Sequence, residues 1–451
     1  MRDGQAPKLA RSTLFCYSLT ELPVVMAMFP VLVFVPKFYT SELGVPLAVA
    51  ANVILLVRIF DILTDPLVGY LSDRTPGRWG RRRPWIAMST PVLMVGFYML
   101  FLPPADAGAG HLLGWMMLLS LGTTMMIIPY YAWAAELSPD YHERSTITGW
   151  RSVVGVVGNL AAQLIPVVAL LMFGYGGAGA VLTTVGIAAV VLMPLCVACT
   201  LLGVPETGHR VPSVTPFASG VRLMLENGPF KRLILAFMIG STAMAITTPL
   251  YLFFITFVLD AEEKAVFMLT FFFLANLVAV PFWVWLSRRT GKHVAYVASF
   301  SLIAAAHPLY LLLGPGDFWW MLPITLLTGF AAGGFAALPN SMKADVIDLD
   351  ALRSGENRAA LFFSTWSFTA KMSGSLGGWI ALTGLAWVGF DASPGARNDP
   401  DQLWGLRLLF SLVPSTFFLL ACAIIWRYPI TERVHAQLRQ DLARQGSGAT
   451  T

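Results

Sequence analysis

The chain has 451 residues, of which 56% are hydrophobic and only 12% charged, and its mean hydropathy is +0.68. This apolar share exceeds what a soluble globular protein needs for its core, so the composition predicts a polytopic membrane protein instead. The net charge of +5 does not indicate nucleic-acid binding, because Lys and Arg concentrate in alternate loops beside the apolar segments. Basic residues in those places set the orientation of a protein in the membrane.

About twelve apolar segments have the length of a bilayer-spanning helix and predict an all-α protein of two six-helix bundles. The first six are predicted near residues 13–39, 46–72, 84–103, 112–136, 146–172 and 179–203. A polar, proline-containing segment, 204–230, predicts a linker between an N-terminal bundle, 1–203, and a C-terminal bundle with a tail, 231–451. The last six are predicted near residues 231–258, 263–288, 293–313, 318–340, 358–388 and 403–427.

The alternation of basic loops predicts the orientation. Basic residues gather in segments such as 74–83 and 433–444, while the opposite loops contain chiefly Lys264 and Arg397. Because cytoplasmic loops carry the excess of Lys and Arg, both termini and the linker are expected in the cytoplasm. We expect a monomeric integral protein of the plasma (inner) membrane, whose partners are membrane lipid and a small-molecule substrate, with no nucleic acid.

Short motifs repeat between the two halves. The segment LSDRT at 71–75 returns as LSRRT at 286–290, each followed by Gly and further basic residues. Pro129 and Glu136 have counterparts in Pro339 and Asp345 at nearly the same offset. Such repeats predict two related bundles, an architecture in which the substrate site lies between the halves and access alternates by rocking.

The segment RIFDILTDP, residues 58–66, places Arg58, Asp61 and Asp65 inside a predicted span. A charge at the centre of a membrane helix costs about 2.5–3.5 kcal/mol on insertion scales, so these residues should face the bundle interior. Spacings of three and four residues place them on one helical stripe, where Arg58 can pair with Asp61 and leave Asp65 freer. The stripe is either a structural ion pair or a cation site.

The same stripe has the donor atoms for a coupling cation. Two carboxylates with the hydroxyl of Thr64 or Thr124 would begin the oxygen cage that a hard cation such as sodium prefers. Closely spaced carboxylates also bind a proton more readily, so a proton carrier is an equal alternative. We expect Asp61 and Asp65 to bind sodium or a proton, and no other cofactor.

Three stretches carry a family resemblance: RIFDILTDPLVGYLSDRTPGRWGRRRPWI at 58–86, PYYAWAAELSPDYHERSTITGWRS at 129–152 and KADVIDLDALRSGENRAALFFSTWSFTAK at 343–371. Together they resemble the glycoside-pentoside-hexuronide:cation symporter family of the major facilitator superfamily, to which the melibiose permease belongs. The resemblance implies the major facilitator fold. It also implies that Asp61, Asp65 and Thr124 match the family's cation site.

The resemblance also implies substrate residues. Arg151, after Trp150, matches a helix 5 arginine that helps to hold sugar, and Lys371 matches a helix 11 lysine associated with the cation site. Trp150 could supply a stacking face for sugar. Interfacial packing of the aromatic rings and a snorkelling lysine remain the alternatives for these residues.

The chain departs from the family pattern at several places. Ile127 stands where the melibiose permease has a helix 4 aspartate, Thr64 replaces an asparagine, and Tyr131 replaces a helix 4 tryptophan. Glu21 is the nearest residue to the helix 1 sugar-binding acid and lies out of register. We count Tyr131 and Glu21 with the substrate-binding candidates. The departures disfavour a galactoside site of the known type.

Charged residues at the cytoplasmic helix ends are candidates for a conformational latch. The candidates are Asp73, Arg78 and Arg144 in the first half, and Asp345 and Arg358 in the second. Positive-inside anchoring is the alternative explanation for the arginines.

These observations predict a cation-coupled symporter for a sugar, glycoside, hexuronide or related small polar solute. A carrier of a lysolipid or another amphipathic substrate is the alternative, because the family resemblance extends to lipid carriers. A multi-span membrane enzyme would need an intramembrane His, Ser or Glu cluster, which the sequence does not show, so no enzymatic activity is expected. The four cysteines lack metal-ligand spacing and are interpreted as packing residues.

Overall fold

The computed structural model describes residues 9–75, 79–138, 141–174, 177–205, 227–354, 359–393 and 395–429, and within these ranges it contains helices and no strand. The chain divides into two compact units. The first comprises Met1–Pro212 with Asp391–Ala396, and the second Ser213–Phe390 with Arg397–Thr451. Most of the predicted linker, 206–226, lies outside the described residues.

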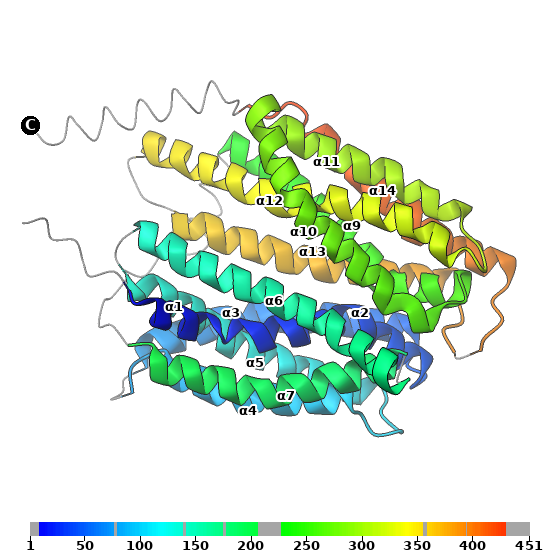
Figure 1. Ribbon diagram of the computed structural model, residues 1–451, viewed down its shortest axis with the longest axis horizontal. Coiled ribbons are helices and arrows are strands. Elements are labelled where there is room, and N and C mark those ends of the chain that lie inside the picture. Colours follow the sequence, from blue (N-terminus) through cyan, green and yellow to red (C-terminus); the bar gives the residue numbers. More distant parts are fainter. Residues whose placement is uncertain are drawn as a thin grey trace, which may run out of the picture. The chain divides into compact units, whose positions relative to one another are not determined.

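The described helices of the first unit are α1 (Arg11–Ser18), α2 (Glu21–Ser41), α3 (Leu47–Arg74), α4 (Arg83–Phe101), α5 (Ala109–Leu137), α6 (Tyr141–Phe173) and α7 (Ala178–Gly203). The helices α1 and α2 together form one candidate membrane span, Arg11–Ser41. In this unit α2 packs against α6 and α7, α5 packs against α3 and α4, and α4 also packs against α7 (Figure 1).

The described helices of the second unit are α9 (Gly228–Phe253), α10 (Ala265–Thr290), α11 (Lys292–Ala306), α12 (Met321–Ser354), α13 (Ala359–Trp387) and α14 (Pro400–Ile425). Short π or 3₁₀ segments flank them: η1 (Phe254–Val258), η2 (Glu262–Lys264), η3 (His307–Leu312) and η4 (Phe318–Trp320). Here α9 packs against α13 and α14, α12 packs against α10 and α11, and α11 also packs against α14 (Figure 1).

The two units therefore use the same helix pairs. If α2 to α7 and α9 to α14 are each counted as first to sixth, the first helix packs on the fifth and sixth in both units. The fourth packs on the second and third, and the third also packs on the sixth. This agreement confirms the prediction, made from short sequence motifs, that the halves are related bundles.

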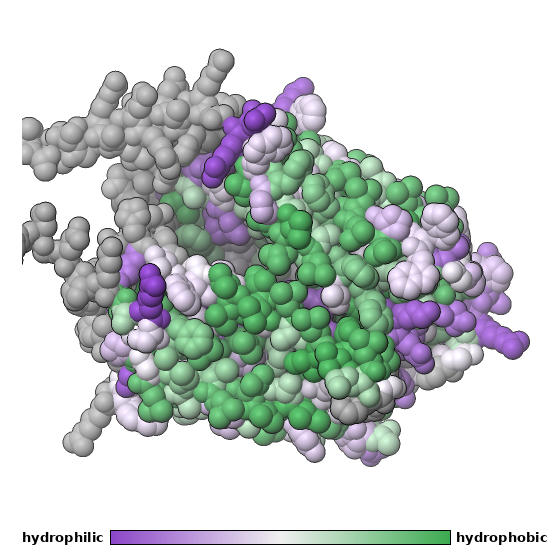
Figure 2. Space-filling model, in the orientation of Figure 1, coloured by the Kyte–Doolittle hydropathy of each residue, from purple (hydrophilic) through white to green (hydrophobic). Residues whose placement is uncertain are grey.

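Eleven of the described helical segments are long and apolar enough to cross a membrane. The remaining long helix, α13, occupies the position of the predicted eleventh span and contains several Ser, Thr and Gly residues as well as Lys371. On the face shown in Figure 2, apolar side chains cover the helices, and hydrophilic side chains gather towards the helix ends. The all-α polytopic fold agrees with the prediction.

The largest difference from the predicted spans is at α12, which continues to Ser354 although the predicted span ends at residue 340. Hydropathy marks the point where apolar residues stop, whereas a helix continues as long as its local hydrogen bonds do. The polar continuation of α12 carries Lys343 and Asp345. The fold thereby gives these two side chains fixed positions on a helix.

Close packing of α12 against α10 depends on glycine. A Cβ on Gly329 would lie 2.5 Å from the carbonyl oxygen of Phe272, and one on Gly333 would lie 2.7 Å from that of Asn276. The two glycines are four residues apart, as are their two α10 contacts, so one face of each helix is in contact. Small residues with this spacing allow membrane helices to approach closely where lipid offers no hydrophobic driving force.

Candidate functional site

The charged stripe of α3 points towards α5 within the first unit. Arg58 forms an ion pair and hydrogen bond with Asp61, as the helical spacing predicts. Asp61 is only 4% exposed, and its other carboxylate oxygen accepts a hydrogen bond from the Ser120 hydroxyl of α5. The buried carboxylate therefore has a cation on its own helix and a neutral donor on the neighbouring helix.

The second acid of the stripe has a similar link to α5. The Thr124 hydroxyl donates a hydrogen bond of 2.8 Å to Oδ1 of Asp65, and Thr124 is buried. The hydroxyl of buried Thr64 donates to the carbonyl oxygen of Phe60, at 3.1 Å, which leaves its oxygen lone pairs as acceptors. The structure thus brings Asp61, Asp65 and Thr124 together between two helices.

Sequence reasoning missed Ser120. The sequence contains one indication of its role: Ser120 and Thr124 are four residues apart, as are Asp61 and Asp65. Residues with this spacing share one helix face, so two packed helices can form two acid–hydroxyl pairs one turn apart. The spacing of Ser120 and Thr124 becomes informative only when the structure shows that α3 and α5 are neighbours.

The atoms gathered here are carboxylate and hydroxyl oxygens, the ligand type of hard cations. Among the described residues, no group of three or more His, Cys, Asp or Glu side chains could hold a metal ion. A cation bound between α3 and α5 would therefore depend on the hydroxyl groups as well as on the two carboxylates. The same arrangement could instead hold a proton on either carboxylate.

A second cluster joins α2, α5 and α6. The Arg151 guanidinium lies over the Tyr131 ring, 3.8 Å from its centroid, and its Nε lies 3.9 Å from Oε2 of Glu21. The Tyr131 hydroxyl donates to Oε1 of Glu21 at 3.1 Å. The fold thus brings together three substrate-binding candidates that are far apart in sequence.

Two further tyrosines support this cluster. Tyr17 and Tyr130 stack with ring centroids 4.5 Å apart, and each hydroxyl donates to the other residue's carbonyl oxygen, at 2.7 and 2.6 Å. The pair fixes the start of the first span against α5, next to Tyr131. Sequence reasoning did not select Tyr17 or Tyr130.

The remaining substrate candidates are less informative. In the part of the chain that the structure describes, Trp150 is half-buried on α6 and makes no ring contact or hydrogen bond with the Arg151 cluster. Lys371 is half-buried on α13 of the second unit. Their predicted roles stay predictions.

A charge cluster fixes one end of the first unit. Nη2 of Arg82, which directly precedes α4, lies 2.6 Å from Oε1 of Glu136 on α5 and 2.6 Å from Oδ1 of Asp73 on α3. Its Nη1 donates to the Ser72 hydroxyl at 3.0 Å. Although burial favours the neutral form, hydrogen bonds and the charges of Glu136 and Asp73 raise the pKa of the Arg82 guanidinium above its ordinary value. One guanidinium therefore ties three helices together.

The second unit has a related ion pair at the same pair of helices. Nζ of Lys292, the first residue of α11, donates to both carboxylate oxygens of Asp345 on α12, at 2.7 and 2.8 Å. Burial raises the pKa of the nearby Tyr428 hydroxyl above its ordinary value, and the negative charge of Asp345 adds a smaller contribution in the same direction. In both units the beginning of the third helix is joined to the C-terminal part of the fourth. The predicted latch candidates Arg78 and Arg358, and the side chain of Arg144, lie outside the described residues.

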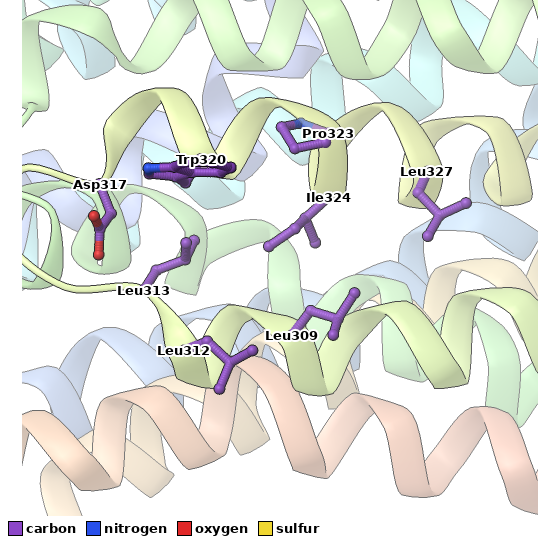
Figure 3. A pocket seen from close by; sticks show the side chains of 8 residues that line it. All are labelled: Leu309, Leu312, Leu313, Asp317, Trp320, Pro323, Ile324 and Leu327. Atoms are coloured by element: carbon purple, nitrogen blue, oxygen red, sulfur yellow. The ribbon is translucent and has the colours of Figure 1, made fainter.

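An apolar cavity of about 450 Å³ lies elsewhere in the second unit, between η3 and the beginning of α12. Figure 3 shows Leu309 and Leu312 on one wall and Ile324 and Leu327 on the other, with Asp317 at one end. Leu327 is about 24 Å along α12 from Lys343, at 1.5 Å per residue. The cavity is therefore remote from Lys343 and Asp345, although Asp317 lies at its end.

The architecture and the buried polar groups define a class of protein. Secondary transporters typically consist of two related six-helix bundles and carry acidic and basic side chains inside their membrane-spanning helices. This protein has both features.

A family comparison agrees with this class. Residues 16–432 match the family described as MFS/sugar transport protein, and the chain belongs to this family. The family resemblance inferred from sequence motifs is thereby confirmed, and the chain is an integral membrane transporter.

Similar proteins have more than one kind of named substrate. YagG of Escherichia coli (strain K12), which carries the name of a glycoside/cation symporter, is 27% identical over 418 residues, covering 89% of this chain and 88% of YagG. The sodium-dependent lysophosphatidylcholine symporter 1 of Gallus gallus is 27% identical over 448 residues, covering 89% of this chain and 84% of that protein. The solved structure of the nucleoside transporter NupG has a TM-score of 0.65 at 13% identity, covering 93% of this chain and all of NupG, which is a likeness of fold.

The two carboxylates that pair with Arg82, those of Glu136 and Asp73, allow a matched test of this charge cluster. The side chain of Glu136 is 4% exposed and that of Asp73 is 54% exposed, although both lie 2.6 Å from the same nitrogen. Glu136→Gln should lower the free energy of unfolding by about 3 kcal/mol, because it leaves a buried cation undercompensated. Asp73→Asn should lower it by less than about 1 kcal/mol, as for exposed pairs. Denaturant titration of the detergent-purified protein measures both, and equal losses would contradict this assignment.

Proposed function

We propose that this protein is a cation-coupled symporter that moves a sugar, glycoside, hexuronide or related small polar solute by alternating access. The observation that carries the proposal is the pair of acid–hydroxyl contacts, Asp61 with Ser120 and Asp65 with Thr124, inside two membrane-spanning helices. A static anchor would need only the Arg58–Asp61 ion pair. The second acid gives the site capacity for a transported cation.

The coupling cation is sodium or a proton, and Asp61 and Asp65 are its ligands or carriers, with Thr64 and Thr124 contributing oxygen. Two relatives whose names include symport with a cation support coupling. Coupling requires that cation occupancy change the affinity of one conformation for substrate. The α3–α5 contacts favour such a change, because binding would replace hydrogen bonds that hold these helices together.

The substrate is held by the cluster of Glu21, Tyr131 and Arg151, with Trp150 and Lys371 as further candidates. A guanidinium beside a carboxylate and a ring face provides donors, acceptors and a stacking surface, which together suit sugar hydroxyl groups. The Glu21 carboxylate, linked to Arg151 and Tyr131, supplies the acid that the resemblance places on helix 1.

A carrier of lysolipids is the second candidate function. The similarity to a named lysophosphatidylcholine symporter is as high as that to a named glycoside symporter. Ile127 also stands where a sugar-binding acid would be expected, which makes this region less polar. Uptake of a radiolabelled glycoside, a hexuronide and a lysolipid by the same proteoliposomes separates the two candidates.

Both termini and the 204–230 linker are proposed to be cytoplasmic in the plasma (inner) membrane, and one chain is proposed to act as a monomer, because it contains both bundles. The basis is the positive-inside rule applied to the alternate loops. A green fluorescent protein fused after residue 451 should fluoresce, and alkaline phosphatase at the same position should be inactive. Active phosphatase would contradict this orientation.

Replacing either acid of α3 should abolish coupling. Asp61→Asn and Asp65→Asn keep the size of the side chain and remove the charge that binds the cation. Both variants should lose accumulation of substrate against its gradient and cation-stimulated binding, while downhill exchange continues. Uptake into proteoliposomes, with sodium and proton gradients imposed separately, measures the effect and identifies the cation.

The matched control for these variants is Asp106→Asn, because Asp106 is exposed and lies between α4 and α5. It should transport as the wild type does. If both α3 variants still accumulate substrate with unchanged cation dependence, these acids are structural and the symport proposal is wrong.

Arg151→Ala should weaken substrate binding by at least about tenfold, because a hydrogen bond to a charged group contributes about 1.5–3 kcal/mol. Arg151→Lys should be intermediate, since it keeps the charge and loses the planar fork. Isothermal titration of the purified protein measures both. Arg289→Ala is a suitable control, because it removes another cation–π contact, with Trp285 at 4.8 Å, at an exposed helix end. Normal affinity of Arg151→Ala would show that Arg151 does not bind substrate.

A further inference from the structure

A lysine that sequence reasoning did not select is buried in the second unit. Lys343 is 4% exposed and lies on α12, inside the candidate membrane span Phe318–Ile347. Its neighbours on the helix include Met342 and Val346, which belong to the hydrophobic core. A lysine is almost never fully buried unless it is paired, so its surroundings should contain a partner.

The partners in the described part of the chain are neutral. Nζ of Lys343 donates to Oδ1 of Asn340 at 3.2 Å and lies 4.3 Å from the ring centroid of Phe363 and 4.8 Å from that of Trp366. No described carboxylate forms an ion pair with it. An ammonium has three donors, and aromatic faces compensate for only part of the hydration that is lost on burial.

The Trp366 ring next to Lys343 is held in place by other aromatic rings. The Trp366 ring stacks on Phe237 at 4.0 Å between centroids, and Phe237 stacks on Phe335 at 5.8 Å. By contrast, Phe363 is 53% exposed and Asn340 is also exposed. The ammonium therefore lies against a rigid aromatic wall, directly beneath the surface of its unit, where a small movement of Phe363 would admit a ligand group.

Comparison of the two units shows that the group formed by Lys343, Phe363 and Trp366 lacks an acid among the described residues. In the first unit a cation–π pair, Arg151 over Tyr131, joins the fourth and fifth helices, and Glu21 completes it with a carboxylate. In the second unit the corresponding helices, α12 and α13, carry Lys343 over Trp366. The second cluster has the cation and the aromatic ring, and no acid among the described residues.

From these observations we propose that Lys343 binds an anionic group of the transported substrate, a carboxylate or a phosphate. The proposal rests on the proposed transport function and narrows its substrate class. An anion would complete the compensation of a buried charge, so binding is favoured most for substrates that bring one. Acidic solutes are therefore preferred to neutral analogues of the same shape.

The test compares matched pairs of ligands on the purified full-length protein in nanodiscs. One pair is phenyl β-glucuronide and phenyl β-glucoside; the other is lysophosphatidic acid and a monoacylglycerol with the same acyl chain. The wild type should bind the anionic member of one pair at least about tenfold more tightly, the lower range for a charged hydrogen bond. The pair that responds identifies whether carboxylate or phosphate is the source of the anion.

Lys343→Gln should remove this preference by weakening only the anionic member, and Lys343→Arg should retain most of it. Lys231→Gln, a change at an exposed lysine of α9 in the same unit, should leave the preference unchanged. A second readout is the tryptophan emission of the wild type, which the anionic ligand should change through Trp366 and which Trp366→Phe should not show.

Three results would overturn the assignment: a wild type that does not prefer the anion, an equal preference in Lys343→Gln, or an emission change that persists in Trp366→Phe. If the wild type binds no member of either pair, the proposed function itself is contradicted. If the wild type binds both members of a pair and Lys343→Gln leaves the ratio of their two affinities unchanged, only the role of Lys343 is contradicted.

Discussion

The energetic penalty for burying charge in a membrane is the constraint on which the rest of this structure depends. A charged side chain at the centre of a membrane helix costs several kcal/mol unless it faces the protein interior and finds partners there. The first unit meets this requirement with groups from adjacent helices: Asp61 lies between Arg58 and Ser120, and Asp65 accepts from Thr124. The contacts that make the charges tolerable are therefore also the contacts that pack α3 against α5.

The two units solve the same packing problem with different chemistry. If the LSDRT and LSRRT motifs set the register, Asp61 and Asp65 of α3 correspond to Asn276 and Val280 of α10. The charged stripe has no acid counterpart there, and α10 instead meets the glycines of α12 through its backbone. One repeat thus holds its second and fourth helices together with polar groups, and the other does so with close contact of small residues.

This difference has a functional meaning within the proposed mechanism. A glycine contact is insensitive to ions, whereas acid–hydroxyl pairs can exchange their partners when a cation binds. Coupling to a cation would accordingly be confined to the first unit. The shared ion pairs at the helix ends, Arg82 with Glu136 and Lys292 with Asp345, are retained in both units and keep the repeat geometry common to them.

The sequence by itself determined the class and the general outline of this protein. Hydropathy located the spans, because the length of a membrane helix is set by the thickness of the bilayer, and the spacing of Arg58 and Asp61 predicted their pairing within one helix turn. What only the tertiary structure decided were the partners from other helices. Ser120 opposite Asp61, Glu21 beside Arg151, and Lys343 beneath Phe363 depend on which helices are neighbours and how each is rotated. Sequence periodicity defines the face of one helix and carries no information about the helix that packs against it.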